Sequence, residues 1–316
     1  MKLILTILLL ISSVYAVKIQ EPNSKFIASG AVVDLMYKDK KLYAATSSGS
    51  VDIFDIDTHK LVQQIEVEKI KDFMGDKSNS KVYSVDKIND KILVLSQGQK
   101  GARRIHIYQN KKLKLIIPYT KKLFIAKAKF LDKNTIIMAL LSNEIISYNI
   151  KKATQNYRIQ VSQSKFSNFS LTENKKEIVV ADESGIISIL NAKNGLVKKR
   201  LSGQNLDNVF QVDIKNGIIA TAGQDRRMVI YTLKSNAAYY EMSDFLIYSV
   251  GLSPSGKIVG YASDQNNNIT VFNTQSKKVL GKFGGNKMTL SNILFLNEST
   301  FLCSSDDKTI NMYTIK

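Results

Sequence analysis

Side chains that commonly carry out chemistry are scarce in this chain of 316 residues. It contains two histidines, His59 and His106, and one cysteine, Cys303. His106 stands between two isoleucines in an alternating pattern typical of a strand, and His59 follows Asp57-Thr58 in a polar segment typical of a turn. Cys303 lies in an apolar run, where a small buried side chain is more usual than a nucleophile. Serine hydrolysis also needs an oriented base. We therefore expect no catalytic residues and no metal site.

Arginines are the next candidates, because four of the six in the chain occur as two adjacent pairs, Arg103-Arg104 and Arg226-Arg227. A guanidinium group presents a planar set of five donors that suits carboxylates. The pairs are therefore candidate anchors for an acidic protein partner. The alternative is that they are solvated charges in turns.

The elements that position these residues follow from a repeat of about 41 residues. An aromatic or leucine residue marks the third strand of each unit, and each unit resolves into four short runs rich in β-branched and aromatic residues, separated by polar turns. Seven such units predict an all-β fold, a seven-bladed β-propeller formed by residues 17–316 as a single domain. The markers are Phe54, Tyr108, Tyr148, Leu190, Tyr231, Phe272 and Tyr313.

The last unit contains only three of its four strands before the chain stops at Lys316. An incomplete blade would leave an exposed edge, which favours aggregation. The run Ser24–Ala28, ahead of the first unit, has no partner of its own. We predict that it becomes the outer strand of the seventh blade and closes the ring.

One interval of the repeat is longer than the others and contains an inserted segment, Val67–Lys81. Strand alternation places this segment on the same propeller face as both arginine pairs. Its apolar residues Ile70, Phe73 and Met74 indicate a plug resting on the propeller or, alternatively, a contact for a partner. The opposite face receives lysine pairs, to which we assign no function: Lys40-Lys41, Lys111-Lys112, Lys151-Lys152, Lys175-Lys176 and Lys277-Lys278.

The first 16 residues have the pattern of an export signal. Lys2 is followed by an apolar run from Leu3 to Ile11, and small residues, Val14 and Ala16, stand at positions −3 and −1 of the expected cleavage site. The run is shorter than the roughly 20 residues of a spanning helix, so a retained anchor is the weaker alternative. We expect cleavage after Ala16 and a periplasmic protein, a monomer without a transmembrane anchor.

The formal net charge is +18. Such a charge could suit nucleic acid, an anionic membrane or an acidic protein. A chain so rich in Lys, Asn and Ile is also typical of an AT-rich coding sequence, and export argues against nucleic acid. We therefore expect no nucleic-acid partner.

Several turns resemble those of WD40-type repeats. Leu252-Ser253-Pro254-Ser255-Gly256-Lys257 is similar to the turn between the first and second strands, and residues 304–313 and 222–231 are similar to the passage from the second strand to the third. The family's Gly-His dipeptide and tryptophan are missing, so its buried His-Ser-Asp-Trp hydrogen-bond set cannot form. Aspartates nevertheless hold the turn position at Asp182, Asp225, Asp264 and Asp306.

The chain further resembles the NapL-like exported propellers that are accessory to periplasmic nitrate reductase. The resemblance rests on residues 82–86, 95–101, 222–227 and 250–257, which are scaffold turns. It implies a non-catalytic protein-binding platform whose partners are nitrate reductase subunits or maturation factors. No haem, iron–sulfur or molybdenum ligand set is visible, so no cofactor is expected. The alternatives are a general cell-envelope assembly scaffold and a lactonase-like small-molecule enzyme that uses the central channel.

Overall fold

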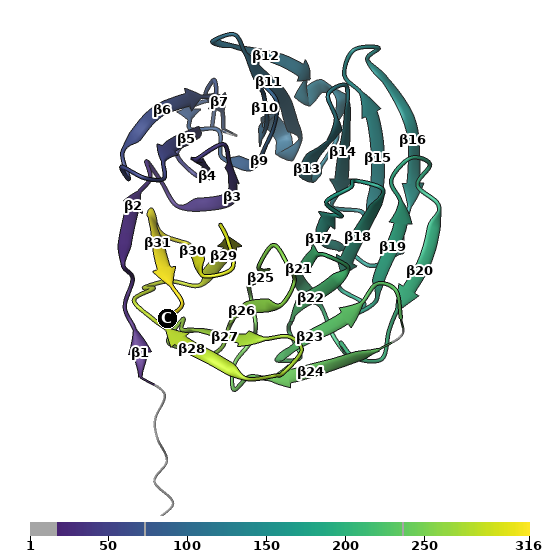
Figure 1. Cartoon of the computed structure of the whole chain (residues 1–316). Helices are drawn as coiled ribbons and strands as arrows, with labels where there is room; N and C mark the ends of the chain where they lie inside the picture. The colour runs from purple at the N-terminus through teal and green to yellow at the C-terminus, as the bar shows by residue number, and fades with distance from the viewer. Residues whose placement is uncertain (1–17, 73, 236) are drawn as a thin grey trace, which may run out of the picture.

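The computed structural model describes residues 18–72, 74–235 and 237–316 of the chain. Seven four-stranded antiparallel blades surround a central axis, which confirms the predicted propeller (Figure 1). Within the described residues the helical elements are two short 3-10 turns, η1 (Gln99–Gly101) and η2 (Tyr119–Lys121), and no helix is long and apolar enough to span a membrane. The expected export signal lies outside the described residues.

The first strand of each blade lies nearest the channel and the fourth lies at the outer rim (Figure 1). Blades one to four consist of β3 (Val32–Lys38), β4 (Lys41–Thr46), β5 (Ser50–Asp55) and β6 (Leu61–Glu66); β9 (Val82–Ile88), β10 (Lys91–Gln97), β11 (Arg103–Gln109) and β12 (Lys112–Ile117); β13 (Ile125–Asp132), β14 (Thr135–Leu140), β15 (Glu144–Asn149) and β16 (Thr154–Gln160); and β17 (Phe166–Leu171), β18 (Glu177–Asp182), β19 (Ile187–Asn191) and β20 (Val197–Leu201).

Blades five to seven follow the same plan and complete the ring. They consist of β21 (Val209–Lys215), β22 (Ile218–Gly223), β23 (Arg227–Thr232) and β24 (Ala238–Met242); β25 (Val250–Leu252), β26 (Ile258–Ala262), β27 (Ile269–Asn273) and β28 (Val279–Phe283); and β29 (Leu290–Phe295), β30 (Thr300–Ser305) and β31 (Thr309–Thr314) with β2 (Ser24–Ile27).

Burial explains why the second and third strands are almost continuously apolar. Neighbouring blades pack face to face, so these strands are covered on both sides, whereas the outer strand meets solvent. All six residues of β14 are buried, while β16 at the rim is mostly exposed. The core lies between the blades: Leu93 of blade two and Phe130 of blade three belong to one apolar cluster.

The ring closes as the sequence predicts. β2 pairs antiparallel with β31, with Ser24 opposite Met312 and Phe26 opposite Ile310. The Phe26 side chain is 1% exposed and lies edge-on to Phe54 of blade one, with ring centroids 5.5 Å apart. The closing strand therefore contributes to the core as well as covering an edge.

A second N-terminal strand was not predicted. β1 (Ile19–Gln20) pairs in parallel with β28 and makes blade six five-stranded. The approach is close, because a Cβ atom at Gly284 would lie 2.6 Å from Cγ2 of Ile19. Residues 19–27 thus join the outer edges of two neighbouring blades.

Aspartates on three inner strands each link their own blade to the next one. The Asp34 carboxylate accepts the Val85 N–H at 3.0 Å, and Asp86 accepts the Phe130 N–H at 2.7 Å. Asp213 accepts the N–H of residue 252 at 3.0 Å in the same way. These carboxylates bind backbone donors that strand pairing leaves unused, so their first role is structural.

The turn aspartates take other partners in place of the WD40 hydrogen-bond set. Asp182 is buried and accepts from Asn143 Nδ2 at 2.8 Å and from the Ser162 hydroxyl at 2.7 Å. Asp225 accepts the Leu206 N–H at 2.7 Å. Ser162 and Leu206 lie in loops between blades and Asn143 in a turn of blade three, so each contact fastens a loop or turn to the following blade.

Candidate functional site

The two faces of the ring differ in the apolar residues that they expose. We call loop face the side formed by the loops between blades and by the turns between second and third strands, and turn face the opposite side. Within the described residues, the turn face has one exposed large apolar side chain in its turns, Leu196. The loop face has six in its loops and turns: Met74, Phe124, Leu141, Leu206, Phe245 and Met288.

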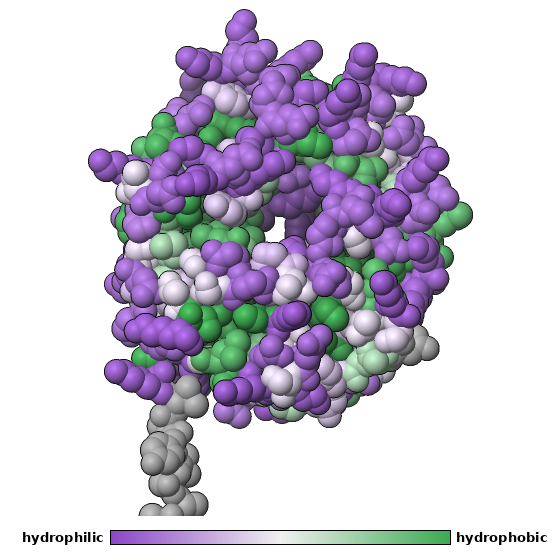
Figure 2. Space-filling view, viewed as in Figure 1, coloured by the Kyte–Doolittle hydropathy of each residue, from purple (hydrophilic) through white to green (hydrophobic). Residues whose placement is uncertain are grey.

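The net positive charge of the loops and turns lies mainly on the other face, the turn face. The turns of the turn face carry many more lysines than carboxylates, so much of the net positive charge gathers there. Figure 2 shows one side of the ring, where hydrophilic side chains are interspersed with hydrophobic ones around an open channel. The turn-face lysines are Lys40, Lys60, Lys111, Lys133, Lys151, Lys152, Lys175, Lys176, Lys193, Lys234, Lys257, Lys277 and Lys278, and the carboxylates are Asp39, Asp57, Asp90, Glu173 and Glu298.

The first arginine pair separates into one buried and one half-buried side chain. Arg104 is 6% exposed, and its guanidinium donates to the Glu68 carbonyl at 2.6 Å and to the Ser80 hydroxyl at 2.8 Å. It thereby fastens the inserted segment to blade two, and it is not accessible to a partner. Arg103 lies over the Tyr83 ring, with its guanidinium carbon 4.1 Å from the ring centroid.

The second pair lies on blade five beside several exposed apolar side chains. Arg226 is exposed in the turn before β23, and Arg227 lies over the Tyr240 ring at 4.3 Å. Arg227 is paired with Met242 in the sheet, and the Arg226 carbonyl accepts the N–H of residue 243. Together with the neighbouring loops these residues form what we call the blade-five patch: Leu206, Arg226, Arg227, Tyr240, Met242 and Phe245.

The inserted segment folds partly onto the propeller. It contains a small hairpin of β7 (Ile70–Lys71) and β8 (Lys77–Ser78). Ile70 is buried, as the plug interpretation predicts, whereas Met74 at the tip is 72% exposed. Phe73 lies outside the described residues. Of the two that the structure describes, Met74 is therefore the one placed for contact with a partner.

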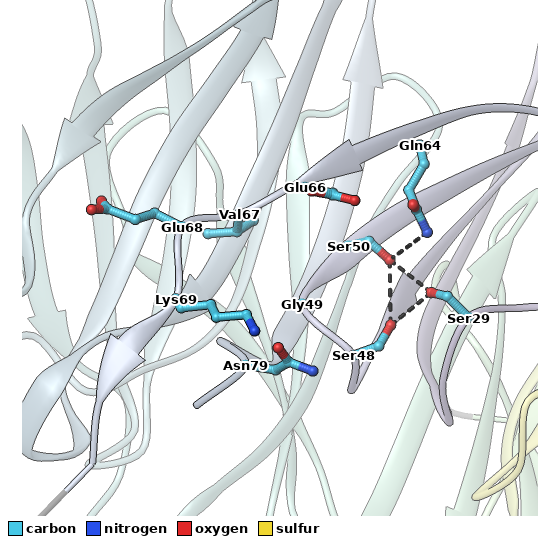
Figure 3. Close-up of a pocket in the computed structure, with 10 residues that line it drawn as sticks. All are labelled: Ser29, Ser48, Gly49, Ser50, Gln64, Glu66, Val67, Glu68, Lys69 and Asn79. Carbon is cyan, nitrogen blue, oxygen red and sulfur yellow. Dashed lines mark hydrogen bonds between the residues drawn. The ribbon is translucent and has the colours of Figure 1, made fainter. Parts of the chain in front are cut away.

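A hollow of about 550 Å³ lies between blade one and the inserted segment (Figure 3). Three hydroxyls meet there, since Ser29 Oγ lies 2.6 Å from Ser48 Oγ and 2.8 Å from Ser50 Oγ. Ser50 donates to the Asp52 carboxylate at 2.8 Å. None of the ten lining residues is a histidine, and the Asp52 carboxylate that accepts from Ser50 also accepts the Ser29 N–H.

His106 and Cys303 are both buried in surroundings that oppose ionisation of their side chains. Burial and the nearby Arg104 charge lower the pKa of His106 to about 4, so its ring is neutral at physiological pH. Burial raises the pKa of the Cys303 thiol far above its usual value, which keeps it protonated. Across the described ranges, His, Cys, Asp and Glu side chains do not gather into a group that could hold a metal ion.

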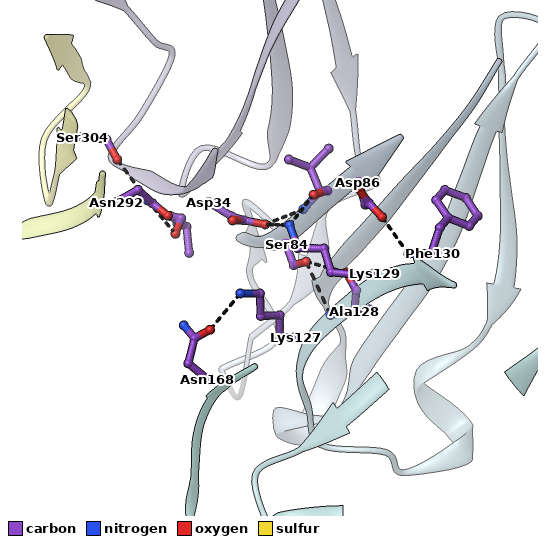
Figure 4. Close-up of polar contacts among 12 residues, drawn as sticks. Asp34, Ser84, Asp86, Lys127, Ala128, Lys129, Phe130, Asn168, Asn292 and Ser304 are labelled. Carbon is purple, nitrogen blue, oxygen red and sulfur yellow. Dashed lines mark hydrogen bonds and ion pairs between the residues drawn. The ribbon is translucent and has the colours of Figure 1, made fainter. Parts of the chain in front are cut away.

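The channel holds a polar cluster that the sequence analysis did not identify (Figure 4). Lys129 Nζ donates to Asp34 at 2.8 Å and to the Val85 carbonyl at 2.8 Å. Lys127 Nζ donates to Asn168 Oδ1 at 2.9 Å. A cavity of about 210 Å³ lies beside them, lined by the inner strands of six blades. One signal was present in the sequence: residues 127 and 168 occupy equivalent places in successive repeats.

Comparison with known proteins shows the fold and leaves the family open. No protein-family model and no curated protein matches the sequence. A chain of the mitotic checkpoint complex is 13% identical, with a TM-score of 0.77 over 93% of this chain and 95% of that one. The β-propeller domain of Cps50 (Swd1) from Myceliophthora thermophila is 12% identical, with a TM-score of 0.72 over 93% of this chain and 99% of that one.

The computationally designed protein Ika8 is also similar, at 14% identity and a TM-score of 0.66, over 90% of this chain and 83% of that one. At such identities the likeness concerns the fold alone. This chain is thus a seven-bladed, WD40-like β-propeller. Propellers of this kind commonly mediate protein–protein interaction, and one of the neighbours comes from a complex.

Proposed function

We propose that this protein is an exported, non-catalytic binding platform that docks a protein partner on its loop face. The observation that carries the proposal is the blade-five patch, in which exposed leucine, methionine, phenylalanine and tyrosine side chains surround two arginines. Tyr, Phe, Met and Arg are the residues enriched in protein interfaces, and Tyr and Arg are frequent hot spots. A rigid ring that presents such residues on loops is suited to binding.

The patch also suggests what kind of partner surface it fits. Asp207 and Asp244 are exposed at its margin, so its charge is mixed rather than purely basic. Such a surface suits a partner whose interface has an apolar centre and a rim with both positive and negative side chains. Arg226 is available to bind a carboxylate of that rim. We therefore no longer propose a partner that is acidic throughout. We propose a single carboxylate of the partner that binds Arg226.

For the partner itself we propose subunits or maturation factors of periplasmic nitrate reductase. This part rests on the sequence resemblance to NapL-like accessory propellers, and with it we propose a periplasmic location. The chain offers a matched pair of variants for the test. Leu206 in the patch is 65% exposed and Leu196 on the turn face is 66% exposed.

The experiment is co-purification from periplasmic extract with tagged wild type, Leu206→Gln and Leu196→Gln. Nitrate reductase subunits should be retained by wild type and by Leu196→Gln and lost with Leu206→Gln. Equal retention of the subunits by all three proteins would refute docking on the loop face. Retention of other proteins only, again lost with Leu206→Gln, would keep the docking face and refute the nitrate reductase partner.

A further inference from the structure

The central channel contains an ammonium group that no carboxylate neutralises directly. Over the described ranges, the Asn168 amide oxygen is the one hydrogen-bond partner of Lys127 Nζ, and no carboxylate oxygen lies within 4.0 Å of that nitrogen. Burial and the neighbouring Lys129 lower the pKa of Lys127 to about 8, so most molecules still carry this charge at pH 7. Lys127 is partly buried, and a partly buried charge without a counter-ion is costly.

The carboxylates of the channel are already committed to other groups. Asp34 binds Lys129 and a backbone N–H, and Asp213 binds Lys215 at 3.2 Å and another backbone N–H. Asp86 also accepts a backbone N–H. Moving one of these carboxylates to Lys127 would break a hydrogen bond between blades. Neutralising the Lys127 charge with a carboxylate of the protein is therefore unfavourable.

Two donor groups beside the cavity remain available to a ligand. A lysine ammonium has three N–H donors, and Asn168 accepts one of those of Lys127. Because Asn168 uses its oxygen for that bond, its Nδ2 group is turned away from the ammonium, toward the open channel (Figure 4). An atom bound there could accept from both side chains.

We propose that Lys127 and Asn168 form a binding site for a small oxyanion: a phosphate, a sulfate or the carboxylate group of a small acid. The ligand supplies the missing negative charge and accepts the two available donors. An adjoining cavity of about 270 Å³ extends toward the turn face, and its charged lining residues are four lysines, Lys127, Lys129, Lys175 and Lys215, with Asp86 and Glu173. The lysines of that face raise the local concentration of anions at the mouth. The site is separate from docking on the loop face.

The test uses the full chain in a buffer that contains chloride as its only anion. Phosphate, sulfate and citrate are added one at a time, at constant ionic strength, and the Tm and the Kd are measured. At least one of them should raise the Tm of wild type above the chloride control. Lys127→Met should abolish that rise and weaken binding about tenfold or more, the factor for losing one charged hydrogen bond. Lys193→Met, an exposed turn-face lysine, should behave as wild type.

A second variant separates ligand binding from a purely structural role. Asn168→Asp places a carboxylate beside Lys127, so the Tm in chloride should rise while the response to the added oxyanions disappears. Lys127→Arg keeps the charge and should retain the response. A response to phosphate or sulfate alone identifies an inorganic ligand, and a response to citrate alone identifies an organic acid. Two results would overturn the proposal: no specific response of wild type to any of the three, or an unchanged response in Lys127→Met.

Discussion

Arg103 and Arg104 are adjacent in the sequence but do different work, because successive strand residues point to opposite sides of the sheet. Arg103 lies over Tyr83 near the surface. Arg104 points between blade two and the inserted segment, where it holds the Glu68 carbonyl. Which arginine of such a pair is buried depends on the segment that packs over the strand. For Arg104 that segment is the insertion, which lies outside the repeat.

Replacing Arg104 should therefore destabilise the protein. Arg104→Met keeps the apolar volume but leaves buried acceptors without donors, at an expected cost of about 2–4 kcal/mol in the free energy of unfolding. Arg226→Met, at an exposed position, should change that free energy by less than about 0.5 kcal/mol. Urea unfolding of both variants measures the difference. Equal effects would show that the Arg104 contacts contribute little.

His106 makes stability depend on pH in a defined window. Its pKa is near 6.5 in the unfolded chain and about 4 in the folded protein, so the unfolded state binds more protons between these values. Stability is therefore full above pH 6.5 and falls as the pH drops toward 4. From pH 7 to pH 5 the expected loss is about 2 kcal/mol, since one pKa unit corresponds to about 1.4 kcal/mol.

His106→Leu removes the titrating group and should flatten this part of the stability profile. Urea unfolding of wild type and variant at pH 7 and pH 5 gives the comparison. A wild-type profile that the substitution leaves unchanged would assign the pH dependence to other groups.

At the scale of elements, the closing strand links the first blade to the last. Phe26 packs against Phe54 within a cluster that spans blades seven and one. Phe26→Ala should lower the free energy of unfolding by about 3–5 kcal/mol, as expected for a buried aromatic residue. Deleting residues 18–28 should lower the Tm further, because an edge of blade seven is uncovered as well.

Removing β1 alone, by deleting residues 18–20, should have a much smaller effect. Two residues in parallel pairing cover an outer edge and leave the core intact. Thermal unfolding of the two deletions side by side tests this order. Equal losses of Tm would mean that β1, and not β2, secures the N-terminal segment.

The elements that the sequence predicted are those that the repeat encodes. The 41-residue period and the incomplete last unit were sufficient to place β2, because a local pattern and a missing partner specify it. β1 was missed because two residues have no period, and its place depends on Gly284 allowing a close approach. Residues 127 and 168 were missed because their contact crosses between blades, although their spacing of one repeat was readable.

At the scale of the whole molecule, the ring separates two kinds of surface. Apolar side chains lie on the loops of one face, and lysines lie on the turns of the other. Loops and turns alternate along the chain, so each repeat contributes to both faces. The turns of one face carry thirteen lysines against five carboxylates, and the channel cavity lined by Lys175 and Lys215 lies at that face.

Export is a prediction about the whole molecule that can be tested without the partner. Mature protein isolated from the periplasm should begin at Val17, because cleavage after Ala16 is expected. N-terminal sequencing and intact mass decide it. Recovery of the uncleaved chain in the cytoplasm would contradict the export that the proposed function requires.

The docking face is the central claim, and site-specific photo-crosslinking in living cells tests it most directly. A photoreactive residue is placed at position 206 in the blade-five patch or at position 196 on the turn face, which are almost equally exposed in the folded protein. The account predicts a discrete crosslinked partner from position 206, with nitrate reductase subunits in the adduct, and none from position 196. Crosslinking from position 196 alone, or to the same extent from both, would contradict it.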